Sequence, residues 1–251
     1  MLRIRPDLEL DRRIAALALP ALGSIAAEPA YSLADTAIVG HLGRTELGAL
    51  AIATTALTMT AWVAIFLTTA TTSVVAGLAA RAPGRAGRSV GAAYLVAAGG
   101  GIAVAVVVAV TAPWVAELLG ARGEVLAGSV GYLRAAAVGM PFLYLSYAGN
   151  GHLVGLANAR TPLRIAVSAN VLNIALEVLL VYGLRLGLLG SAWGTVIAQV
   201  AAAAWYGAAS RRAAVRPRRP GRAEVAALLR DGHQLSVRTI ALGVVPLTTT
   251  A

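Results

Sequence analysis

The stretch that decides the fold class is Ser89–Leu119, which reads SVGAAYLVAAGGGIAVAVVVAVTAPWVAELL. Its 31 residues carry a single charged side chain, that of Glu117. The hydrocarbon core of a bilayer is about 30 Å thick, and one helical crossing needs roughly 20 apolar residues. The stretch is therefore long enough to span a membrane, and either to tilt or to extend past it.

The rest of the chain repeats this pattern. Of its 251 residues, 58% are hydrophobic and only 13% are charged, whereas a water-soluble domain has about 25% charged residues. The mean hydropathy is +0.75. Seven apolar segments are expected, the last of them incomplete: Ile14–Val39, Leu47–Ala80, Ser89–Leu119, Gly128–Leu153, Leu163–Leu184, Leu188–Ser210 and Gln234–Ala251. The fold class that follows is an all-α polytopic membrane protein.

The basic residues divide unequally between the two sides of such a protein. All 21 are arginine, and the net charge is +10. Sixteen lie at the N-terminal end and in the second-to-third, fourth-to-fifth and sixth-to-seventh connections, against four on the opposite side: Arg44, Arg122, Arg134 and Arg185. Because cytoplasmic loops carry the excess of Lys and Arg, we expect a bacterial inner-membrane protein with a cytoplasmic N-terminus. Topology accounts for the arginines, so the expected partner is the lipid bilayer and not nucleic acid.

Composition divides the chain into four parts. Residues 1–13 are expected to be a cytoplasmic N-terminus, because the apolar segment behind them is too long for the core of a signal peptide. Six transmembrane helices occupy 14–210, a cytoplasmic linker rich in Arg and Pro occupies 211–232, and the truncated start of a seventh helix occupies 233–251. The truncation predicts that the chain is the front part of a longer protein. The chain has no cysteine, which excludes disulfides and thiolate metal sites.

Three acids lie within apolar segments, where a charged side chain costs roughly 2.5–3.5 kcal/mol: Glu28, Asp35 and Glu177. Glu28 and Asp35 are seven residues apart, so they share one face of the first helix. Pro29, next to Glu28, removes a backbone hydrogen bond and favours a kink, and Pro20 does the same nearer the start of the helix. We expect this polar, kinked helix to face a cavity inside the bundle.

Glu177 has a polar neighbour on its own helix. Asn173 precedes it by four residues, so the two side chains stack on one face. No arginine lies in the middle of a complete helix to neutralise the acids. An embedded carboxylate without such a partner either stays protonated or binds a cation. The pattern therefore indicates ion coupling, with hydrogen bonding for packing alone as the alternative.

Other polar features favour structural roles. Threonines are frequent in the second segment, where threonine commonly bonds the preceding helical turn, and Gly99–Gly101 favours close packing of helices. The three histidines lack the spacing of metal ligands, and a serine protease built from Ser191 and His152 would rest on a common dipeptide and one histidine. We expect no enzyme activity and no resident cofactor.

Four stretches, in order between residues 12 and 210, resemble one family. They are LALP at 17–20 with Glu28-Pro29 and LADTAIVGHLG at 33–43, GLANARTP at 155–162, NIALEVLLVYG at 173–183, and GSAWGT at 190–195. Together they are similar to the first six helices of multidrug and toxic compound extrusion (MATE) transporters. The first of them resembles the DinF-type branch of that family.

The resemblance implies a fold of twelve helices in two six-helix lobes that work by alternating access. This chain would be the N-lobe plus the start of helix seven. The resemblance also implies a cation or proton site in the N-lobe: Asp35 and Asn173 match an aspartate and an asparagine of the family, and Glu177 stands where an aspartate is common. The supporting polar positions are Tyr132, Asn150 and Thr195. The expected coupling ion is H⁺ or Na⁺, with Na⁺ held at Asp35, Asn173 and Glu177.

The function that the resemblance implies is secondary active multidrug efflux, in which amphipathic organic cations leave in exchange for H⁺ or Na⁺. The full-length protein is expected to act as a monomer. Two alternatives stay open: a flippase for lipid-linked saccharides or a peptidoglycan precursor, and a membrane module that binds a partner without transport. Such a flippase needs cationic residues for a pyrophosphate group, and the complete helices carry acids instead. A lone N-lobe cannot close an alternating-access cycle, so the chain by itself is expected not to transport.

Overall fold

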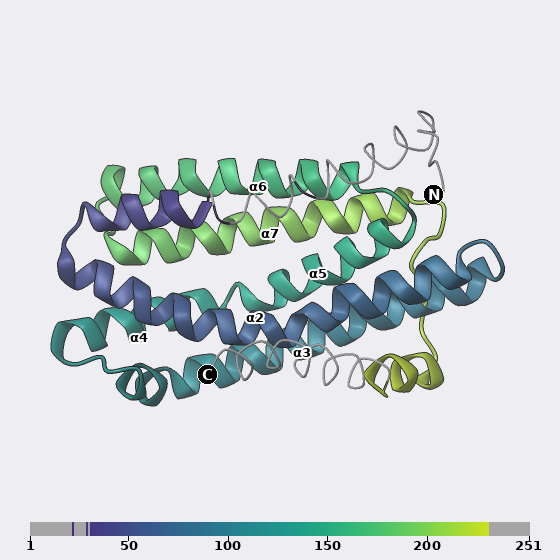
Figure 1. The fold of residues 1–251 in the computed structure, drawn as a ribbon, viewed down its shortest axis with the longest axis horizontal. Coiled ribbons are helices and arrows are strands. Elements are labelled where there is room, and N and C mark those ends of the chain that lie inside the picture. Colours follow the sequence, from purple (N-terminus) through teal and green to yellow (C-terminus); the bar gives the residue numbers. More distant parts are fainter. Residues whose placement is uncertain (1–21, 23–28, 30, 231–251) are drawn as a thin grey trace, which may run out of the picture.

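The computed structural model describes residues 22, 29 and 31–230, and these are helical almost throughout (Figure 1). A first helix covers 31–40, and a short helix at 222–230 ends the described chain. Between them lie α2 (Arg44–Leu78), α3 (Pro83–Leu118), α4 (Gly123–Ala137), α5 (Met140–Gly155), α6 (Arg160–Val178), the π-helical turn η1 (Leu179–Gly183) and α7 (Leu188–Arg212). The described residues contain no β-strand. The expected start of helix seven, at 233–251, lies outside them.

Length and composition identify most of these helices as membrane spans. α2, α3, α7 and the combined α6–η1 helix are each long and apolar enough to cross a bilayer, and α4 and α5 meet the same test when the bent pair is taken as one span. Large apolar side chains of α3 point outwards, with Val106, Val110 and Trp114 all more than half exposed. A helix that is apolar on all its faces is typically surrounded by lipid and not by water. The prediction of an all-α polytopic membrane protein is confirmed.

The fourth expected segment, Gly128–Leu153, is not one helix. It forms α4 and α5, whose axes differ by 50°. Pro141, in the first turn of α5, has no backbone N–H with which to continue the hydrogen-bond ladder of α4. A side chain at Gly139 would overlap that of Gln199, so the bend brings this connection against α7. The segment is therefore long and apolar enough for the expected span, but the helix is bent at its middle, where proline interrupts the hydrogen-bond ladder.

The fifth expected segment, Leu163–Leu184, changes its helical form near its end. α6 is a regular α-helix until it passes into η1. There the N–H of Leu184 donates to the carbonyl oxygen of Leu179, five residues earlier, at 2.8 Å. Such π-helical turns are rare and frequently lie at functional sites. This one begins two residues after Glu177.

Glycines let α5 pack closely against α2 and α3. A Cβ atom at Gly101 of α3 would lie 2.6 Å from the Cα of Pro141, and one at Gly151 would lie 2.5 Å from the carbonyl oxygen of Thr68 on α2. A Cβ at Gly99 would meet nothing within 4 Å. The expectation of close packing is therefore confirmed at Gly101 and wrong at Gly99.

The threonines of α2 have two kinds of partner. Five donate to the preceding turn of their own helix, as expected: Thr54, Thr55, Thr58, Thr60 and Thr69. Thr68 and Thr72 donate instead to the carbonyl oxygens of Tyr147 and Gly151 on α5, at 3.0 and 3.1 Å. The contact between α2 and α5 is thus both close and polar.

The connections alternate between the two ends of the bundle. The α2–α3 turn, the α5–α6 turn and the end of α7 lie together on the right of Figure 1, and the connections that lead into α2, α4 and α7 lie on the left. Twelve described arginines belong to the first end: Arg81, Arg85, Arg88, Arg160, Arg164, Arg211, Arg212, Arg216, Arg218, Arg219, Arg222 and Arg230. Three belong to the other end: Arg44, Arg122 and Arg185. We call these the arginine-rich end and the arginine-poor end. Arg134 lies in the last turn of α4, next to the bend between α4 and α5.

Candidate functional site

A cluster of buried polar side chains joins four helices in the arginine-poor half of the bundle. Its members are Asp35 of the first helix, Tyr132 of α4, Asn173 and Glu177 of α6, and Ser191 and Thr195 of α7. All except Thr195 are no more than 5% exposed. We call this group the carboxylate cluster.

Two glycines of α7 allow the helices of the cluster to meet. A Cβ at Gly190 would lie 2.8 Å from the backbone of Leu180 in η1, and one at Gly194 would lie 3.3 Å from the backbone nitrogen of Glu177. Without side chains at these positions, α6 and α7 approach closely. Ser191 and Thr195, each one residue after a glycine, are thereby brought to the acid-bearing face of α6.

Hydrogen bonds connect most of the cluster. The hydroxyl of Ser191 donates to Oδ1 of Asp35 at 2.8 Å, across 156 residues of sequence. Thr195 donates its one hydroxyl hydrogen to the carbonyl oxygen of Ser191 at 3.2 Å and accepts from Nδ2 of Asn173 at 3.3 Å. Because that hydrogen is used, the Tyr31 hydroxyl, 3.2 Å from Thr195 Oγ1, must be the donor in their contact.

Three acceptor atoms of the cluster are left over. Both carboxylate oxygens of Glu177 and Oδ1 of Asn173 are buried without a hydrogen-bond partner among the described residues. Asp35 lies beside Glu177, and Tyr132 is near enough to both acids to interact with them electrostatically. No described arginine forms an ion pair with either acid. Burying an unpartnered acceptor is costly, so this geometry suits a group that holds a proton or a cation.

The donor set consists only of oxygen atoms. The two carboxyl groups, the free amide oxygen of Asn173 and the hydroxyls of Ser191 and Thr195 are hard ligands. The described residues contain no group of three or more His, Cys, Asp and Glu side chains that would hold a metal ion. The arrangement therefore fits H⁺ or a monovalent cation such as Na⁺ better than a transition metal.

The structure brings together most, but not all, of the residues expected at this site. Asn150 of α5 is half-buried and makes no hydrogen bond to the cluster among the described residues, so its assignment stays a prediction. Glu28 and Pro20, expected at the kink and cavity of the first helix, lie outside the described residues. Pro29 is described and exposed, but its expected kink involves residues that are not described.

Two members of the network were not among the expected site residues. Tyr31 lies on the polar face of the first helix, four residues before Asp35, and this spacing was a usable signal. Ser191 gave a weaker one, since it lies four residues before Thr195 on α7. Only the pairing of Ser191 with Asp35 shows that it belongs to the site.

A second buried network lies at the arginine-rich end. Nε2 of His152 is 2.8 Å from the carbonyl oxygen of Val215, and its Nδ1 is 2.9 Å from the hydroxyl of Ser210. The Tyr94 hydroxyl is 2.8 Å from the same Ser210 oxygen. A carbonyl oxygen only accepts, so Nε2 carries the hydrogen and Nδ1 accepts from Ser210, which in turn accepts from Tyr94.

This histidine network is complete, because each hydrogen has an acceptor. It also separates His152 from Ser191, which belongs to the carboxylate cluster. The serine-protease arrangement considered from the sequence is therefore wrong.

Comparisons with known proteins agree with this architecture. The MatE family model matches residues 20–179, which is more than half of the chain. DNA damage-inducible protein F of Escherichia coli K12 is 32% identical over 193 residues, covering 76% of this chain and 42% of that protein. Protein DETOXIFICATION 44, chloroplastic, of Arabidopsis thaliana is 30% identical over 204 residues, covering 76% and 39%. The chain thus spans about two fifths of the length of these curated relatives.

The fold has solved counterparts. A transporter of the MOP superfamily from Pyrococcus furiosus superposes with a TM-score of 0.83 at 22% sequence identity, covering 92% of this chain and 53% of that one. This likeness shows the fold, and the family model shows the kinship. The chain belongs to the MATE family, in which it corresponds to the N-terminal half.

Proposed function

We propose that this chain is the ion-coupling half of a multidrug efflux transporter that exports amphipathic organic cations in exchange for H⁺ or Na⁺. The observation that carries the proposal is the pair of carboxyl groups, Asp35 and Glu177, buried side by side without a basic partner. Membership of the MATE family supports transport as the activity. The unequal division of arginines between the two ends supports an inner-membrane location with a cytoplasmic N-terminus.

The coupling step follows from the oxygens that have no partner. With both acids ionised, like charges repel in a low-dielectric site, and one bound proton or Na⁺ removes most of that cost. The ion would be held by Asp35, Glu177 and the free oxygen of Asn173. Tyr132, Ser191 and Thr195 orient these ligands.

Ion uptake would then change how the helices pack. Asp35 belongs to the first helix and Glu177 to α6, so a shared ion draws these two helices together, whereas two bare carboxylates push them apart. This makes a two-state element that an ion gradient can bias. We propose that the ion-bound state has lower affinity for the organic cation, which leaves towards the outside.

The test is transport in a protein that joins this chain to a second lobe. In proteoliposomes, efflux of a fluorescent cationic dye is followed under an imposed pH or sodium gradient. We expect Asp35→Asn to lower gradient-driven efflux more than about tenfold, because it removes a charge that the ion must neutralise. Glu124→Gln, which changes an exposed acid at the same end, is the matched control and should transport like the wild type.

Each outcome has a defined meaning. Normal coupled efflux by Asp35→Asn and by Glu177→Gln would refute the coupling site. Dye movement under only one gradient identifies the coupling ion. Absence of dye movement under both gradients, with the protein correctly inserted, would favour the flippase for lipid-linked saccharides instead.

A further inference from the structure

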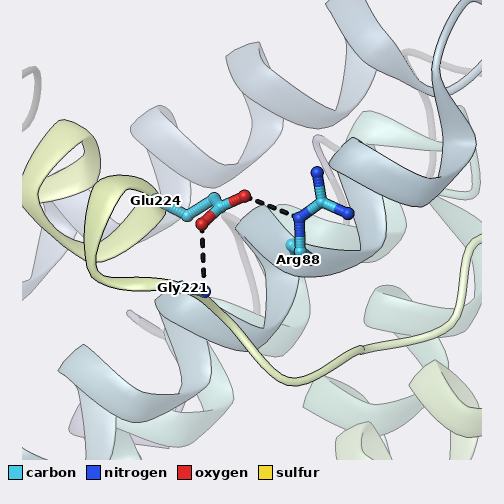
Figure 2. A network of polar contacts seen from close by, with 3 residues as sticks. All are labelled: Arg88, Gly221 and Glu224. Carbon is cyan, nitrogen blue, oxygen red and sulfur yellow. Dashed lines mark hydrogen bonds and ion pairs between the residues drawn. The ribbon is translucent and has the colours of Figure 1, made fainter.

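The arginine-rich end has a charge imbalance that ion coupling does not use. Twelve described arginines lie there, and the one described acid among them is Glu224. That acid is already paired, since Nε of Arg88 lies 2.6 Å from its Oε1 and the N–H of Gly221 donates to its Oε2 (Figure 2). Arg211 and Arg216 of this end therefore form no ion pair among the described residues.

The segment 213–221, which we call the strap, leaves α7 and is held against the bundle. The N–H of Arg218 donates to the carbonyl oxygen of Gly87 on α3 at 2.9 Å, and the carbonyl oxygen of Val215 accepts from His152. A Cβ at Gly87 would lie 2.5 Å from the carbonyl oxygen of Arg216, and one at Gly91 would overlap the backbone of Arg218. The strap therefore has a defined position on α3.

A cavity of about 450 Å³ opens between the strap and the bundle. Its lining residues are Tyr94 of α3, Gly207, Ser210 and Arg211 of α7, and Arg216 and Pro217 of the strap. The hydroxyl hydrogens of Tyr94 and Ser210 are used within the histidine network, so the free donors are the two guanidinium groups. Both arginines are exposed and neither makes an ion pair or hydrogen bond among the described residues. This volume is in the range of small-molecule sites.

An exposed apolar face of α7 adjoins the residues that line the cavity. Gly207 lies four residues before Arg211, and Ala204 and Val200 precede it at spacings that keep them on the same helical face. Ala204 and Val200 are exposed, and a Cβ at Gly207 would meet nothing within 4 Å. The exposed residues of α7 next to the cavity are therefore small and apolar, which suits an acyl chain better than a free anion.

We propose that this cavity binds the phosphate group of an anionic phospholipid, held between Arg211 of α7 and Arg216 of the strap. Guanidinium groups bind phosphate through paired, directed hydrogen bonds. Basic pockets at the cytoplasmic side of helix bundles are suited to such headgroups. The bound lipid would tie the strap to α7 and so fix the path by which the chain leaves the bundle.

The test measures lipid binding directly. The purified chain, stripped of lipid in detergent, is titrated with dioleoyl phosphatidylglycerol or dioleoyl phosphatidylcholine, and the first bound lipid is counted by native mass spectrometry. We expect phosphatidylglycerol to bind more tightly, and the double variant Arg211→Gln/Arg216→Gln to weaken it about twentyfold. The double variant Arg160→Gln/Arg164→Gln removes two exposed arginines of the same end and should change the affinity less than about twofold.

A second variant keeps the charges in place. Gly207→Leu fills the open wall of the cavity, so we expect it to weaken phosphatidylglycerol binding while both arginines and the thermal midpoint stay as in the wild type. Equal affinity for the two lipids, equal loss in the two arginine double variants, or full binding by Gly207→Leu would each overturn the proposal. Displacement of phosphatidylglycerol by inorganic phosphate at millimolar concentration would show a free-anion site and would also overturn it.

Discussion

The carboxylate cluster and the histidine network lie in opposite halves of the bundle and differ in how completely their hydrogen bonds are made. In the histidine network, the hydroxyl of Tyr94 donates to Ser210, Ser210 to His152, and His152 to the carbonyl oxygen of Val215. In the carboxylate cluster, both oxygens of Glu177 have no described partner. Both groups are buried, so burial alone does not distinguish them.

This difference in completed hydrogen bonds distinguishes polar groups that stabilise the fold from polar groups that bind a ligand. A buried network in which every hydrogen bond is made rigidifies a fold, and it has no free donor or acceptor with which to bind a ligand. An incomplete one costs free energy unless a ligand completes it. Thr71 and Gln199 each have one buried oxygen without a partner too, but neither can ionise. Buried acceptor atoms that have no partner and can also carry charge therefore indicate a ligand-binding site.

The largest effect on stability is expected from breaking the histidine network. His152→Ala removes two hydrogen bonds and a fully buried side chain, and it leaves Ser210 and Val215 with unmet polar groups. We expect the free energy of unfolding, measured by titration with sodium dodecyl sulfate, to fall by about 2–4 kcal/mol.

Glu177→Gln is the matched change in the other network. It removes a buried ionisable group that has no partner, so we expect the free energy of unfolding to stay the same or to rise. An equal loss in His152→Ala and Glu177→Gln would contradict the distinction between the two networks.

A smaller effect should come from the packing that places His152. Gly151 precedes it, and a Cβ at that position would lie 2.5 Å from the carbonyl oxygen of Thr68. Gly151→Ala should therefore lower the free energy of unfolding by about 1–3 kcal/mol through overpacking. Gly99→Ala, where a Cβ meets nothing within 4 Å, should be neutral or stabilising by up to about 1 kcal/mol. A neutral Gly151→Ala would mean that α2 and α5 separate easily.

The long apolar segments were predictable because helix length and hydropathy are local properties of the sequence. The bend between α4 and α5 was not predicted, although Gly139 and Pro141 stand at that place. Proline occurs within α3 too, at Pro113, without ending that helix. The close approach of Gly139 to Gln199 also depends on where α7 packs, which no local pattern indicates.

Those residues of the candidate site that share one helix could be predicted, because their spacing in the sequence places them on the same helical face. Asn173 and Glu177 share a face of α6 by their spacing, and Tyr31 precedes Asp35 by one turn. The bond from Ser191 to Asp35 joins residues 156 apart, and no local pattern indicates it. It depends on how the first helix packs against α7, and such a contact is a property of the assembled bundle.

The smallest effect is expected from the ion pair that secures the helix at 222–230 to α3. The hydrogen bond from the Arg88 guanidinium, with smaller contributions from the backbone N–H groups of Glu224 and Gly221, holds the pKa of Glu224 below its ordinary value of 4.5. A carboxyl group whose pKa is lowered on folding stabilises the fold above its unfolded pKa, and this contribution is lost as the pH falls through the folded pKa. Glu224→Gln should thus matter at pH 7 and lose its effect below the folded pKa.

Because this pair is partly exposed to water, the effect is expected to be local and modest. Amide hydrogen exchange of residues 222–230 should be about two- to fivefold faster in Glu224→Gln than in the wild type at pH 7 and low salt. The ratio should approach one in 0.5 M NaCl, where the Debye length shrinks to about 4 Å. The histidine network provides the contrast, since its neutral hydrogen bonds make the protection around Val215 insensitive to salt. If added salt loosened both places equally, the strap would be held by charge throughout, and the completeness of the histidine network would no longer explain its position.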